Sequence, residues 1–155
     1  MFFVWQLSPN RPATPKETAD ILRYVDAFAA TPEGAWLRKI DYRKKKFFWC
    51  DAMRRDPDIT GCWSCLIPGK IFLRPSPNPG NAFWHEDIAA DVIQELRNAW
   101  QFKYLGPLYY LLVLPRIRKL TIEAAAAKVT EEADNFCREM AKADAIRRYK
   151  RRIVC

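Results

Sequence analysis

The stretch from residue 116 to 152 reads RIRKLTIEAAAAKVTEEADNFCREMAKADAIRRYKRR, and its pattern is the main basis for the fold class that the sequence predicts. Apolar side chains recur along it in steps of four and three residues, the spacing of one helical face. The members of this seam are Ile122, Ala126, Val129, Ala133, Phe136, Met140 and Ala143. Because the seam is narrower than a face turned to a globular core, we expect a long helix that lies across other subunits.

Two further stretches predict helices with defined ends. Thr14-Pro15-Lys16-Glu17 is a capping box with proline at the first helical position, so we expect a helix over residues 15–30. Another helix is expected over residues 83–105, where Gly106-Pro107 stops it. Apolar residues at helical spacing support both helices: Ile21, Leu22, Val25 and Phe28 in the first, and Ile88, Val92, Leu96 and Trp100 in the second.

The sequence between these two helices predicts one more helix and then irregular chain. Thr31-Pro32-Glu33 has the pattern of a second helix start, and Trp36, Ile40 and Phe47 mark one face of a helix over residues 32–55. Asp56-Pro57 ends it, because a residue before proline avoids the helical region. Residues 57–83 have no period and contain five prolines and three glycines, so we expect a long irregular segment that lies along another surface, for example that of a partner protein.

Together these patterns predict an all-α fold of extended helices rather than a closed compact bundle. The expected helices are 15–30, 32–55, 83–105 and 116–152. We expect one extended helical subunit over residues 1–155. Its parts are an apolar arm (1–13), a helical pair (14–55), a loop rich in Pro and Cys (56–82), and a helix followed by the long C-terminal helix (83–155).

Composition points away from an enzyme. The 155 residues include 26 Lys plus Arg against 18 Asp plus Glu, a formal charge of +8, and one histidine. A single histidine makes a Ser-His-Asp site or a multi-histidine metal site hard to assemble, so we predict no catalytic residue and no cofactor. The longest run without charge, Tyr104 to Pro115, is shorter than the roughly 20 apolar residues that a membrane-spanning helix needs.

The N-terminal stretch 1–10 is apolar but has the pattern of neither a signal peptide nor a transit peptide. We expect it to pack on a neighbouring protein or on the protein's own core. The alternative is a segment that rests on a membrane surface.

A basic cluster precedes three aromatic residues in the middle of the chain. Arg38, Lys39 and the run Arg43 to Lys46 lead into Phe47-Phe48-Trp49. Basic residues interleaved with aromatic ones suit nucleic-acid binding. These lysines, however, fall on the polar face of the predicted helix, so we favour a solvated face or one turned to anionic lipid or an acidic partner. The basic C-terminal tail, residues 147–152, is open to the same alternatives.

The five cysteines leave several kinds of chemistry open. Cys62-Trp63-Ser64-Cys65 is a CxxC pair, and Cys50 and His85 would complete a weak candidate Cys3His zinc site. In an oxidising compartment the cysteines would instead form disulfides, and in a reducing one they would be buried thiols. Because five is odd, at least one thiol stays free or pairs with another chain.

One stretch is more specific than any of these patterns. Lys44-Lys45-Lys46-Phe47-Phe48-Trp49 is followed, after three residues, by Met53-Arg54-Arg55-Asp56-Pro57-Asp58-Ile59-Thr60-Gly61-Cys62. It resembles the centre of the PDSW-type accessory subunit of mitochondrial respiratory complex I (NADH:ubiquinone oxidoreductase). In that family a basic, aromatic helix ends in Arg-Arg, one variable residue, Pro-Asp-Ile-Thr, another variable residue and Cys.

The resemblance implies an all-helical, non-catalytic accessory subunit on the intermembrane-space face of the mitochondrial inner membrane. Its partners would be other subunits of the complex and, peripherally, anionic lipid; we do not expect nucleic acid. The implied contact residues are Arg43, Lys44, Lys45, Phe47, Phe48, Trp49, Arg54 and Arg55.

The family is also rich in cysteines and holds disulfides. Only Cys62 matches it by position, and the implied pairing joins Cys62 or Cys65 to Cys137. The chain departs from the family after Cys62, since the next cysteine follows sooner and the stretch 66–81 is unfamiliar. Alternatives are an RNA-contacting accessory protein of the mitochondrial ribosome, an accessory subunit of another inner-membrane respiratory complex, and a zinc-binding module.

Overall fold

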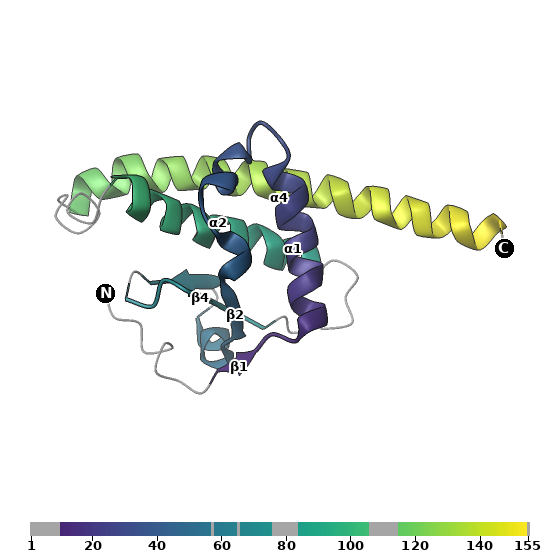
Figure 1. Ribbon diagram of the computed structural model, residues 1–155, viewed down its shortest axis with the longest axis horizontal. Helices are drawn as coiled ribbons and strands as arrows, with labels where there is room; N and C mark the ends of the chain where they lie inside the picture. Colours follow the sequence, from purple (N-terminus) through teal and green to yellow (C-terminus); the bar gives the residue numbers. More distant parts are fainter. Residues whose placement is uncertain (1–9, 57, 65, 76–83, 106–114, 155) are drawn as a thin grey trace.

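The part of the chain that the structure describes combines three α-helices with a four-stranded mixed sheet, so the expected all-α fold is wrong (Figure 1). The computed structural model describes residues 10–56, 58–64, 66–75, 84–105 and 115–154. Within these ranges the helices are α1 (Pro15–Ala29), α2 (Trp84–Leu105) and α4 (Pro115–Val154). The strands are β1 (Arg11–Pro12), β2 (Lys46–Trp49), β3 (Gly61–Trp63) and β4 (Lys70–Leu73).

The sheet has the order β1-β2-β4-β3, with β2 and β4 parallel and the two outer pairs antiparallel. Phe47 lies beside Ile71, and Phe48 lies beside Phe72. Because side chains alternate between the faces of a strand, Phe47 and Ile71 point to the helices and join the main core. Phe48 and Phe72 point to the other face, where they meet a smaller apolar cluster that includes Met53.

The predicted helix over residues 32–55 is wrong. Short 3-10 turns, η2 (Ala35–Lys39), η3 (Tyr42–Lys44) and η4 (Asp51–Arg55), surround strand β2 instead. Thr31 does not start an α-helix: its hydroxyl accepts from the Gly34 amide and donates to the Phe28 carbonyl, closing a turn. A Cβ at Gly34 would lie 2.0 Å from that carbonyl oxygen, so the turn packs too closely for any other residue.

The irregular segment expected over residues 57–83 is also partly wrong, because it contributes β3 and β4. Both strands pair with chain distant in sequence or with each other, and Trp63 and Leu73 join the main core. Of its proline-rich part, residues 76–83 lie outside the described ranges, as does the apolar arm up to residue 9.

The three other predicted helices are confirmed. The capping box forms at α1: the Glu17 amide donates to the Thr14 hydroxyl, and the Thr14 amide donates to the Glu17 carboxylate. Helix α1 buries Ile21, Val25 and Phe28. Helices α2 and α4 run side by side and form the most extensive helix contact, while α1 packs across both (Figure 1).

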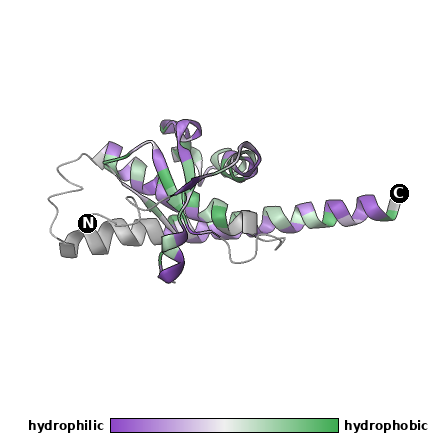
Figure 2. Cartoon of the chain, turned by 90° about the horizontal axis from the view of Figure 1, so that it is seen from below, coloured by the Kyte–Doolittle hydropathy of each residue, from purple (hydrophilic) through white to green (hydrophobic). Residues whose placement is uncertain are grey.

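The long helix α4 is partly a core element, contrary to the expectation that its seam serves other subunits. Val129, Ala133 and Cys137 are buried in the main cluster. Residues 145–153 of α4 are exposed, and the C-terminal end of the helix projects away from the body in both views (Figures 1 and 2). Within the described ranges, no helix is both long enough and apolar enough to span a bilayer.

Candidate functional site: the arginine pocket and the α4 arm

The body-facing side of helix α4 changes from apolar to charged where the helix passes α1. Its body-facing side carries the buried residues Ala133 and Cys137, and the same side continues through Asp144, Arg148 and Arg151. At about 100° per residue these positions share one helical face. The face that is apolar over the core is therefore lined by charged groups beyond it.

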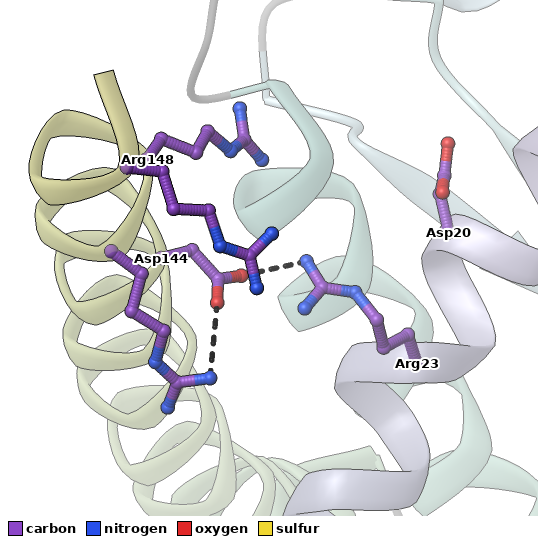
Figure 3. Close-up of a pocket in the computed structure, with 6 residues that line it drawn as sticks. Asp20, Arg23, Asp144 and Arg148 are labelled. Carbon is purple, nitrogen blue, oxygen red and sulfur yellow. Dashed lines mark ion pairs between the residues drawn. The ribbon is translucent and has the colours of Figure 1, made fainter. Parts of the chain in front are cut away.

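These charged groups meet α1 in a surface pocket of about 340 Å³ (Figure 3). We call it the arginine pocket. Its lining consists of Asp20 and Arg23 from α1 and Asp144, Arg147, Arg148 and Arg151 from α4. Four guanidinium groups against two carboxylates leave a formal charge of two positive units.

Asp144 organises the pocket. Its Oδ2 lies 2.8 Å from Nη2 of Arg23, and its Oδ1 lies 4.0 Å from Nη1 of Arg147 (Figure 3). The Asp144 side chain is only 15% exposed. The hydrogen bond from Arg23 to Asp144 raises the pKa of the guanidinium further above its ordinary value, so this pair stays charged. The pair also ties α4 to α1.

Arg148 and Arg151 are the other two cations of the pocket, and neither has a carboxylate partner within the described part of the chain. Figure 3 shows the Arg148 side chain reaching over Asp144 toward Arg23. Like charges one turn apart on a helix repel each other. The arrangement therefore brings guanidinium groups together while leaving two of them available to an anion.

The end of α4 also carries an apolar stripe on its other side. We call residues 145–153, all of which are exposed, the α4 arm. Ile146, Tyr149 and Ile153 are 55%, 66% and 65% exposed. The helical repeat places this stripe opposite the arginine pocket. Apolar and basic residues alternate along the arm in Figure 2.

The structure scatters the contact residues that the sequence predicted. Phe47 and Trp49 are buried in the main core, and Phe48 is half-buried beneath the sheet. Arg43 pairs with Asp26, Lys44 with Asp41, and Arg54 with Asp51; Arg55 is exposed. These residues do not form one basic and aromatic surface.

Lys45 instead lines a second pocket, of about 250 Å³, beside Trp63, Phe102 and Lys103. Its ammonium donates to the Pro68 carbonyl oxygen. Burial, with a contribution from Lys103, lowers the pKa of Lys45, while Asp41 opposes the shift. Both lysines are already engaged with backbone carbonyls, since Lys103 donates to Lys39.

The cysteines of the predicted sites lie in different places. Cys50 and Cys62 are buried in the small cluster, whereas Cys137 is buried in the main one. The side chains of Cys65 and His85 lie outside the described residues. No group of potential metal ligands gathers among the residues that are described, and the implied Cys62–Cys137 disulfide is not formed there.

Comparison with family models, curated proteins and solved structures finds no significant match to this chain. The basic tail is visible in the sequence, but the pocket is not, because Arg23 and Asp144 are distant in sequence. The available signal was the position of Asp144, Arg147, Arg148 and Arg151 on one helical face.

Proposed function

We propose that the protein is a non-catalytic component of a larger assembly and docks on it through the α4 arm. The observation that carries this proposal is that the apolar residues of α4 move from one side of the helix to the other along its length. Apolar residues face the protein's own core up to Ala141, and then appear on the opposite side at Ile146, Tyr149 and Ile153. Within the part of the chain that the structure describes, this apolar stripe lies exposed, so it suits a partner.

The partner is a protein with an apolar groove bordered by carboxylates. The arm adds five cations, and no acidic residue follows Asp144. A helix that offers side chains at i, i+3 and i+7 fits a groove on another protein. Complementary charge then orients the contact and speeds association.

A specific form of this proposal is the accessory subunit of mitochondrial complex I, on the intermembrane-space face of the inner membrane. It is supported by the stretch from Lys44 to Cys62 alone. The all-helical fold that the resemblance implies is not found, since β2 occupies the place of its basic helix. A subunit of another inner-membrane respiratory complex would use the arm in the same way.

The second candidate is an accessory protein of the mitochondrial ribosome that contacts RNA. The observation in its favour is the concentration of cations at the end of α4, because arginine-rich helices neutralise phosphates. Base stacking by Phe47 and Trp49 is no longer part of this candidate, since both are buried.

Native electrophoresis of mitochondrial membranes from the source cells tests the proposal, with the tagged chain followed by blotting. The wild type should migrate with a large complex. Replacing Ile146, Tyr149 and Ile153 by serine should release it as the free chain. The control is Leu66→Ser, which removes an apolar side chain that is 66% exposed on the body and should leave migration unchanged.

Two results would count against docking through the arm: a wild-type chain that migrates alone, or a triple variant that stays in the complex. The accompanying subunits identify the assembly. Loss of the large species after ribonuclease treatment would select the ribosomal candidate.

A further inference from the structure

We infer that the arginine pocket binds the phosphate group of a small phosphomonoester. This site lies on the opposite side of α4 from the docking stripe, and the inference does not depend on the proposed function. Its ligand is either soluble or the headgroup of a phospholipid, because both present the same chemical group.

The net charge of the arginine pocket matches that of a phosphomonoester. The pocket's four guanidinium groups and two carboxylates leave two positive charges. A phosphomonoester carries close to two negative charges at neutral pH, since its second pKa is about 6. A carboxylate or a phosphodiester supplies one negative charge, and would leave part of the repulsion in place.

The placement of the guanidinium groups also suits a phosphate. Asp144 pairs with Arg23 and Arg147, while Arg148 and Arg151 stand one turn apart without a carboxylate of their own in the described chain. A guanidinium presents two parallel N–H groups that match phosphate oxygens. Arg148 reaches over the Asp144–Arg23 pair (Figure 3), so an anion there would meet donors from both helices.

The size and polarity of the pocket limit the ligand to a small polar molecule. A volume of about 340 Å³ lies at the lower end of the range for small-molecule sites, roughly 300–1,000 Å³. All six lining residues are charged. The pocket therefore suits a phosphate with a short polar substituent, such as glycerol phosphate. A nucleic-acid strand would need cations spread along a groove, whereas these converge from two helices.

The alternative is that these arginines are an ordinary solvated helix end. The chain supplies a matched control for it, because Lys150 and Arg152 belong to the same helix end but not to the pocket lining. The double variants Arg148→Gln/Arg151→Gln and Lys150→Gln/Arg152→Gln remove equal charge. If phosphate binds in the pocket, only the Arg148/Arg151 variant should bind it more weakly. If the attraction is a general electrostatic one, both variants should be weakened equally.

The experiment is isothermal titration of the full-length protein with glycerol 3-phosphate at pH 7.5 and constant ionic strength. The wild type and the Lys150/Arg152 variant should bind alike. Loss of the charged hydrogen bonds in the Arg148/Arg151 variant should weaken binding by about tenfold or more. Circular dichroism and thermal unfolding of each variant verify that it is folded.

A second experiment uses sedimentation with phosphatidylcholine vesicles that contain phosphatidic acid, which has a phosphomonoester headgroup. Vesicles with phosphatidylglycerol, a phosphodiester, are adjusted to equal surface charge. Selective loss of phosphatidic acid binding in the Arg148/Arg151 variant identifies a lipid source, and selective loss in titration identifies a soluble one.

The inference is overturned if neither probe binds, or if both double variants weaken binding equally. The serine variant of the stripe should retain phosphate binding while losing assembly. Failure of the phosphate site and failure of the docking proposal are thereby separated.

Discussion

At the scale of single residues, Glu95 is the most unusual group in the protein. Its carboxylate is buried between α2 and β3, where it accepts from the Trp63 amide at 2.8 Å and from Asn98 at 3.1 Å. Burial raises its pKa from 4.5 to about 7, and nearby Asp91 adds to the shift against these two hydrogen bonds. A carboxylate that binds its proton more tightly in the folded state makes stability depend on pH.

The direction of this pH dependence follows from the protonation of Glu95 in the folded and the unfolded state. Between pH 4.5 and 7 the folded protein holds a proton that the unfolded chain has lost, so the free energy of unfolding falls as pH rises through this window. We expect Glu95 to lower that free energy by about 2–3 kcal/mol between pH 5 and pH 8. Glu95→Gln keeps an acceptor for the Trp63 amide and should remove this part of the change.

Urea unfolding of the wild type and Glu95→Gln at pH 5 and pH 8 measures the effect. The exposed Glu131→Gln variant serves as the control and should behave as the wild type does. An equal loss of stability in wild type and Glu95→Gln would show that another group is responsible.

At the scale of elements, the helices were predictable and the sheet was not. Helix α1 carries its capping box and its apolar period in adjacent residues, so local sequence is enough. Strands β2 and β4 read KFFW and KIFL, and both faces of the sheet are covered. A strand covered on both faces shows no alternation of polar and apolar residues. Its pairing also joins residues more than twenty positions apart, such as Phe47 and Ile71.

The candidate sites were only partly predictable from the sequence for the same physical reason. The arginines of the tail are visible in the sequence, but Arg23 joins them only through the packing of α1 on α4. The aromatic run Phe47-Phe48-Trp49 looked like a contact surface because its helical placement was wrong. Once it forms β2, alternate residues turn to opposite faces and are covered.

Phe47 therefore gives a direct test of the sheet. It is 3% exposed in the main core, and Phe47→Ala should lower the free energy of unfolding by about 3–5 kcal/mol. Thermal or urea unfolding measures the loss, with Phe47→Leu expected to fall between the alanine variant and the wild type. The neighbouring Lys44→Ala removes an exposed side chain and should change stability by about 0.5 kcal/mol or less. If Phe47→Ala were as stable as the wild type, its side chain would be at the surface.

At the scale of the whole molecule, one helix serves two purposes. The part of α4 up to Ala141 completes the core, where Phe136 meets Phe28 with ring centroids 5.5 Å apart. Residues 145–153, the arm beyond Asp144, are all exposed among the described parts of the chain. A short helix exposed to water is marginal alone, and the arm is helical because it extends a segment that packing already holds.

This division predicts that stability and assembly can be separated by truncation. Removing residues 145–155 takes away exposed side chains and leaves the Arg23–Asp144 pair, so the free energy of unfolding should change by less than about 1 kcal/mol. Removing residues 131–155 also deletes Ala133, Phe136 and Cys137, and should leave the chain unfolded or readily digested. Urea unfolding and limited proteolysis compare the two truncations with the full chain. Were the shorter deletion to unfold the protein, the arm would belong to the core and could not be a free docking element, because its apolar stripe would already be covered within the chain.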